Sequence, residues 1–173
     1  MRGNRSSTSR LFRLHPRLIV LAGLLAAPGW LSAATQTTTF TVTLTLQNNC
    51  LISANPLNFG TQGVLSANVD QTTSLSVTCS TAAPYNVGLD AGTTTGSTVA
   101  ARLLAGSGGA TVGFQLYSDS AHTQVWGNTI GTNTVASSGT GLTQNFTAYG
   151  RIPAQTQPPS GQYIDTIIVT VSY

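Results

Sequence analysis

Hydrophobic and polar residues alternate along much of this chain, and the cleanest alternation covers residues 37–46. There Phe40, Val42, Leu44 and Leu46 alternate with threonines. A period of two places the four apolar side chains on one face of a β-strand and the threonines on the other. Threonine and valine are β-branched and favour an extended chain over a helix. The pattern predicts an amphipathic strand that pairs either within its own chain or with another chain.

Shorter alternating segments follow, separated by clusters of glycine, proline, asparagine and serine. We expect strands over residues 74–79, 85–89, 99–104, 111–117, 146–152 and 162–173, and loops over residues 93–98 and 131–141. In the last strand, Ile167, Val169, Val171 and Tyr173 share one face. Short strands at regular spacing with turn residues between them predict an antiparallel β-sandwich in a single domain.

The first 34 residues have the composition of a secretory signal peptide. Five arginines precede the apolar run 18–27, and small residues at 32–34 predict cleavage after Ala34 or after Ala33. The apolar run is too short to span a bilayer. We therefore expect an exported protein that does not span the membrane after cleavage.

Removal of this leader changes the charge balance. The whole chain has a net charge of +3, but the part after residue 34 keeps two arginines against four aspartates, which gives −2. This part contains no lysine and no glutamate. The basic character of the whole chain therefore belongs to the leader, and we expect no nucleic-acid partner. Missing lysines also remove the charges that commonly keep sheet edges apart.

Cys50 and Cys79 are the only cysteines. In an exported protein the oxidising compartment favours a disulfide between them. A free thiol pair and a metal site are the alternatives, and a metal is disfavoured because His122 is the only other soft ligand after residue 34.

Residues for catalysis are scarce. His122 follows Asp119 in a run that reads as a turn rather than as part of a catalytic triad, and the aspartates are scattered singly. Tyr85, Tyr117, Trp126 and Tyr149 could stack on sugars, but core packing is the simpler interpretation. We expect no enzyme, no metal and no cofactor.

Several ordered segments resemble the spore coat protein U domain family, whose members include subunits of archaic chaperone–usher pili. The segments that carry the resemblance are residues 40–50, 55–60, 76–79, 84–92, 116–119, 125–127, 149–154 and 163–173. They extend in order along the whole chain after the leader. One departure is His122, at a position where the family pattern has arginine.

The resemblance implies an immunoglobulin-like sandwich that lacks its last strand. In such pilins a periplasmic chaperone lends a strand, and at the outer-membrane usher the N-terminal segment of the next subunit replaces it. The resemblance thus implies a signal peptide (1–34), a donor segment (35–47) and a pilin domain (48–173). Phe40, Val42, Leu44 and Leu46 are expected to fill a groove whose edge carries Ile167, Val169, Val171 and Tyr173.

Two hypotheses follow for the function. The first is a non-enzymatic pilus subunit at the surface of a Gram-negative bacterium, with identical or related subunits, a chaperone and an usher as partners, acting in adhesion and biofilm formation. The second is a self-complete secreted coat or envelope protein, or a carbohydrate-binding sandwich, whose first strand pairs in its own sheet. Periodicity alone favours the second hypothesis, and the resemblance favours the first.

Overall fold

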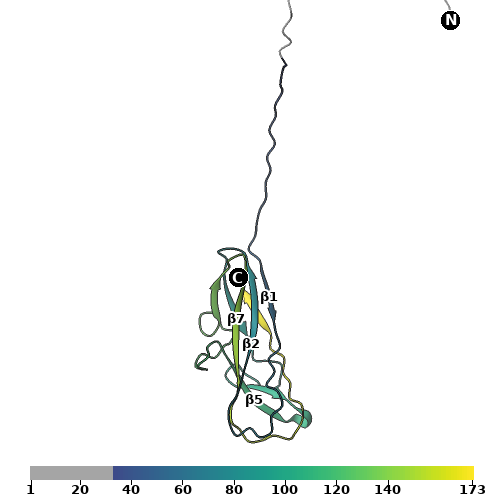
Figure 1. Cartoon of the computed structure of the whole chain (residues 1–173), viewed down its shortest axis with the longest axis vertical. Helices are drawn as coiled ribbons and strands as arrows, with labels where there is room; N and C mark the ends of the chain where they lie inside the picture. Colours follow the sequence, from purple (N-terminus) through teal and green to yellow (C-terminus); the bar gives the residue numbers. More distant parts are fainter. Residues whose placement is uncertain (1–32) are drawn as a thin grey trace, which may run out of the picture. The chain divides into compact units, whose positions relative to one another are not determined.

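Antiparallel β-strands form the regular structure of residues 33–173, the part of the chain that the computed structural model describes (Figure 1). The strands are β1 (Cys50–Ala54), β2 (Val69–Cys79), β3 (Pro84–Leu89), β4 (Arg102–Ala105), β5 (Thr111–Tyr117), β6 (Val135–Ser138), β7 (Thr143–Ile152) and β8 (Val169–Ser172). One 3-10 turn, η1 (Ser107–Gly109), links β4 to β5. The chain divides into two units, residues 1–43 and 44–173. The predicted signal peptide lies almost wholly outside the described residues.

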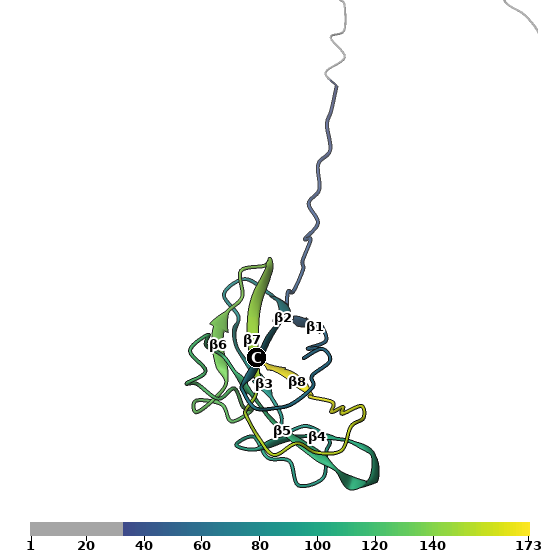
Figure 2. The same ribbon diagram turned by 60° about the horizontal axis from the view of Figure 1, so that its bottom comes forward.

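The strands form two sheets. The larger has the order β1-β2-β7-β5-β4 and the smaller has the order β6-β3-β8. β2 and β7 form the longest pairing, from Val69 opposite Ile152 to Thr78 opposite Thr143. Figure 2 shows β1 next to β8, an edge strand of the smaller sheet. The predicted all-β antiparallel sandwich is therefore confirmed.

Alternate residues of these strands face inward and build one core. Leu75, Val77 and Val87 are almost fully buried, as the period-two pattern predicts. Tyr85 and Trp126 are also buried, and the Trp126 indole donates a hydrogen bond to the Val87 carbonyl. These two aromatic residues therefore pack the core and do not lie on the surface.

A buried arginine joins the two sheets. Arg102 is 0% exposed, and its guanidinium donates to the backbone carbonyls of Asp90, Leu89 and Trp126 and to the side-chain carbonyl of Gln115. Burial lowers the pKa of Arg102 to about 10, so the group stays charged at neutral pH. The carbonyls compensate this charge by hydrogen bonding, as a buried cation requires.

Several boundaries differ from the sequence-based predictions. β6 lies inside the predicted loop 131–141, because it pairs with β3 through its backbone while two of its four side chains are polar and two are exposed. The predicted last strand 162–173 is paired as a strand only over β8, with one isolated bridge from Ile164 to Ala105 before it. Residues 37–46 form no strand in the structure.

Candidate functional site: an open apolar groove

An open groove of about 1110 Å³ lies between the two sheets. Its floor is the inner surface of the core, and its walls are the chain after β1 and the chain before β8. Pockets for small molecules occupy roughly 300–1,000 Å³, so this groove is large enough for a chain segment. The apolar lining residues are Leu57, Phe59, Leu65, Leu75, Leu89, Leu104, Val112, Phe114, Leu116, Ala148, Ile152, Tyr163, Ile164, Ile167 and Val169.

The first wall depends on a glycine in the central strand β7. A Cβ at Gly150 would overlap the Leu57 side chain and would lie 3.0 Å from the Phe59 ring. Glycine therefore lets Leu57 and Phe59 pack directly onto the sheet. At the far end of this wall, the Leu65 backbone N–H donates to the Gln157 side chain and links the two walls.

The second wall carries an open strand edge. β8 pairs only with β3, and Ile168 and Asp90 form a hydrogen-bonded pair there, because the Asp90 N–H donates to the Ile168 carbonyl. Backbone groups of successive residues alternate in direction along an antiparallel strand. Those of Ile167, Val169 and Val171 therefore point away from β3, and within residues 33–173 they have no backbone partner.

Two aspartates hold this second wall against the body of the domain. One carboxylate oxygen of Asp165 accepts four hydrogen bonds from the backbone and hydroxyl groups of Thr93 and Thr94. The Asp90 carboxylate accepts from the N–H of Gly92 and of Ile168. Over residues 165–168, hydrogen bonds to the carboxylates of Asp90 and Asp165 therefore take the place of the strand pairing that the alternation predicted.

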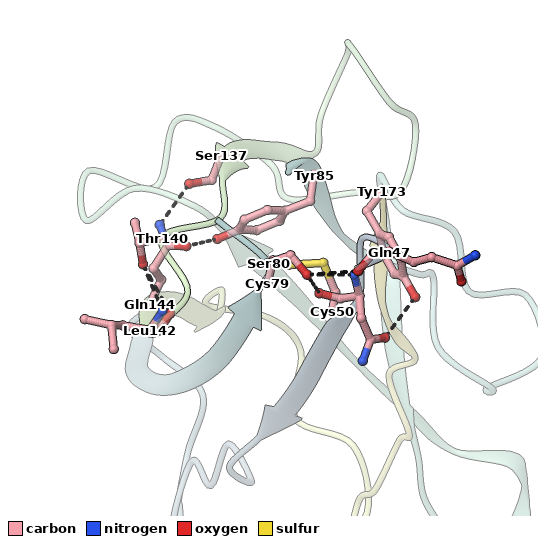
Figure 3. The surroundings of a disulfide bond; sticks show 11 residues. Gln47, Cys50, Cys79, Ser80, Tyr85, Ser137, Thr140, Leu142, Gln144 and Tyr173 are labelled. Atoms are coloured by element: carbon pink, nitrogen blue, oxygen red, sulfur yellow. Dashed lines mark hydrogen bonds between the residues drawn. A yellow bond between two sulfur atoms is a disulfide. The ribbon is translucent and has the colours of Figure 1, made fainter. Parts of the chain in front are cut away.

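The disulfide lies at the start of β1, an edge strand of the larger sheet. Cys50 and Cys79 are bonded and face each other across β1 and β2, with their Cα atoms 4.1 Å apart (Figure 3). Ser80 donates its backbone N–H to the Asn49 carbonyl and accepts the Asn49 N–H with its hydroxyl. The predicted disulfide is confirmed, and it fixes the first residue of β1.

The four apolar residues predicted to fill a groove lie in an exposed segment. Phe40 is 86% exposed and Leu46 is 84% exposed, and Val42 and Leu44 are similarly open. No strand is assigned over residues 33–49. An exposed row of large apolar side chains is costly in water.

Two of the four predicted C-terminal edge residues line the groove. Ile167 and Val169 line it, and Val171 belongs to the partly buried residues that pack on the core. Tyr173 is 59% exposed, and its hydroxyl lies 3.5 Å from the Asn49 side chain, near the disulfide (Figure 3).

The histidine that was considered for catalysis lies in a turn. The Asp119 carboxylate accepts hydrogen bonds from the N–H groups of Gln124 and Thr123, and these bonds lower its pKa. The His122 ring packs edge-on against Tyr117 and Tyr149, with Nε2 3.8 Å from a carboxylate oxygen of Asp70. Within residues 33–173 no cluster of three or more metal-ligating side chains occurs.

The Asp70 carboxylate near this histidine is held by an arginine on the neighbouring strand. Arg151 donates two hydrogen bonds to Asp70, each 2.7 Å long, and this pairing lowers the pKa of Asp70. The pair lies partly exposed on the outer face of the larger sheet. Both groups are therefore engaged with each other, away from the groove.

Sequence reasoning missed most of the groove. The wall 55–65 contains proline and glycine and no long alternation, so it gives no strand signal. The role of Asp165 was also missed, although a single aspartate within an apolar alternating run is an unusual feature of a strand. Asp165 stands where the alternation expects an apolar residue. This was the one sequence signal that could have indicated that hydrogen bonds from a side chain hold the second wall.

Comparisons with known proteins agree with this architecture. Residues 36–170 match the family described as Spore Coat Protein U domain. Protein U of Myxococcus xanthus is 31% identical over 170 residues, covering 90% of this chain and 94% of that protein.

Within residues 33–173 no helix is long and apolar enough to cross a membrane.

A solved structure shares the fold. It is the complex between the chaperone CsuC and the tip adhesion subunit CsuE from the archaic chaperone–usher Csu pili of Acinetobacter baumannii, matched with a TM-score of 0.57 and 21% identity. The match covers 75% of this chain and 41% of the chain in that structure. With the match over residues 36–170 and the identity to Protein U, the chain belongs to the Spore Coat Protein U domain family.

Proposed function

We propose that this protein is a structural, non-enzymatic subunit of a surface pilus and that its groove receives a strand from another subunit. The observation that carries the proposal is the open edge of β8 beside an apolar groove, together with an exposed apolar strand pattern in the same chain. An added strand would pair with the free backbone groups and place alternate side chains in the groove.

The donor in this proposal is the segment 35–47, and the acceptor is the domain 48–173. Phe40, Val42, Leu44 and Leu46 span about 20 Å in an extended chain and present one apolar face. Full burial of four such side chains is worth about 6–12 kcal/mol as an upper bound. A head-to-tail contact of this kind does not close, so it generates an open filament.

Export comes before assembly in this proposal. The leader 1–34 would direct the chain to the periplasm of a Gram-negative bacterium, where a chaperone would cover the groove, and an outer-membrane usher would exchange the chaperone for the next subunit. The resulting pilus would serve adhesion and biofilm formation.

A matched pair of substitutions tests the proposal. Val42→Asp places a charge on the apolar face of the donor, and Thr43→Asp places the same charge on the opposite face. We expect Val42→Asp to abolish polymers in surface-sheared material, because an unpaired buried charge costs several kcal/mol, and Thr43→Asp to retain them. Unboiled electrophoresis shows donor-strand polymers as ladders. Equal behaviour of the two variants contradicts the proposal.

A further inference from the structure

A small polar hollow of about 150 Å³ lies on the outer face of the smaller sheet. Its floor is formed by Asn86 and Gly88 of β3 and by Thr170 and Ser172 of β8. Asn86 pairs with Ser172, and Gly88 pairs with Thr170. These residues alternate with Val87, Leu89 and Val169, which face the core and the groove, so the hollow lies on the opposite side of the sheet.

Gly88 lets the wall of the hollow lie close to its floor. A Cβ at Gly88 would lie 3.0 Å from the Cα of Asn128, so glycine allows the loop 127–134 to approach the strand. The Leu89 N–H donates to the Gly127 carbonyl, which holds the start of this loop against β3.

The loop forms the wall of the hollow and is itself well tied. Asn133 bonds to both Gly127 and Thr129 through its backbone and side chain. The Thr134 hydroxyl donates to the side-chain carbonyl of Asn86, which joins the wall to the floor. The hollow is therefore a fixed feature of the domain rather than a gap between loose segments.

The lining of the hollow is neutral and rich in groups that both donate and accept hydrogen bonds. Amides and hydroxyls supply every polar group, and no charged side chain lines it among the described residues. Within residues 33–173, the hydroxyls of Thr170 and Ser172 and the amide of Asn128 have no hydrogen-bond partner in the protein. Ile130, 58% exposed, adds an apolar surface at the rim.

We propose that this hollow binds one residue of a neutral sugar. A pyranose ring combines hydroxyl groups with an apolar C–H face, which matches amides and hydroxyls beside Ile130. A volume of about 150 Å³ holds several water molecules, which is the scale of one sugar ring. An ionic ligand would lose its hydration without meeting an opposite charge. The site lies apart from the groove, so this proposal does not rest on strand exchange.

Saturation-transfer NMR on the full mature protein tests the proposal, with methyl glycosides of glucose, galactose, mannose and N-acetylglucosamine as probes. We expect at least one neutral glycoside to bind with a dissociation constant of about 1–10 mM, and glucuronate to bind more weakly. The variant Thr170→Val with Ser172→Ala removes two hydroxyls, one from an exposed and one from a partly buried position of β8. We expect it to weaken binding by about tenfold.

Thr147→Val is the matched control, because Thr147 is an exposed threonine on the outer face of the other sheet. It should bind the sugar as the unmodified protein does. No signal from any neutral glycoside overturns the proposal. Binding that the double variant leaves unchanged, or binding of glucuronate tighter than of the neutral sugars, also overturns it.

Discussion

The carboxylate of Asp165 lies directly over the Cα of Gly92, in the space that a Cβ of any other residue would fill. Gly92 has a φ of +88°, a conformation that glycine adopts readily. One oxygen of Asp165 is fully bonded to Thr93 and Thr94, while the other is buried without a hydrogen-bond partner. The contact therefore requires glycine both because of the positive φ and because a Cβ would overlap the carboxylate. It positions the wall of the groove that precedes β8.

Gly92→Ala should loosen this wall. The added methyl group would overlap the Asp165 carboxylate and impose strain at positive φ, and we expect a loss of about 2–4 kcal/mol in the free energy of unfolding. Gly108→Ala is the matched control, because Gly108 also has positive φ but has no neighbour near its Cβ position. It should lose only about 1 kcal/mol. Urea denaturation measures both, and equal losses would contradict the role of the overlap.

Arg102→Lys should destabilise the domain strongly, although it keeps the positive charge. The ammonium group has three donors and no planar fork, so it cannot satisfy the carbonyls of Leu89 and Trp126 and the Gln115 side chain in the same geometry. We expect a loss of about 3–5 kcal/mol in the free energy of unfolding.

Arg151→Lys provides the contrast for this measurement. Arg151 makes a partly exposed pair with Asp70 on the sheet surface, and such pairs contribute little to stability. The two substitutions have the same chemistry and differ in burial. If both variants unfold at the same urea concentration, the buried hydrogen bonds of Arg102 do not stabilise the junction between the sheets.

Alternation and turn residues predicted most strands, because each strand buries one face on the core. These signals missed β6, because its sequence Val135-Ala-Ser-Ser shows little apolar alternation. β6 is held by backbone pairing with β3, which leaves no pattern in the side chains. The same signals extended the last strand too far, since the alternation continues through residues 162–168 while Asp90 and Asp165 take over the backbone contacts there.

The groove itself could not be predicted from periodicity. Residues that line it, such as Leu75 and Leu116, alternate in the same way whether another strand covers them or not. Whether a strand covers these residues depends on the tertiary arrangement, which periodicity does not encode. The disulfide was predictable because an exported chain with two cysteines has a single intramolecular pairing.

Loss of the disulfide should weaken the start of β1. Replacing Cys50 and Cys79 with serine opens a loop with a sequence separation of 29 residues, and the chain-entropy model gives a loss of about 3–4 kcal/mol. Urea denaturation of the oxidised protein, the reduced protein and the double variant measures this contribution. We expect the reduced protein to match the double variant, and a reduced protein as stable as the oxidised one would contradict the prediction.

Acid should destabilise the domain through Asp119 and Asp70. Hydrogen bonds from the Gln124 backbone lower the pKa of Asp119, and the Arg151 guanidinium lowers the pKa of Asp70. A depressed carboxyl pKa contributes stability above the unfolded value of about 3.9, and this contribution is lost as the pH falls through the lower folded value. Melting temperatures should therefore decrease between about pH 5 and pH 2.

Substitution of each aspartate by asparagine separates the contributions of Asp119 and Asp70 to the pH dependence of stability. Asparagine does not titrate, so Asp119→Asn should be less stable than the unmodified protein at pH 6 and should lose less stability on acidification. Adding Asp70→Asn should flatten the profile further, because the low pKa of Asp70 has a different main cause, the Arg151 guanidinium on β7. A double variant that melts with the same pH dependence as the unmodified protein would show that other groups govern acid unfolding.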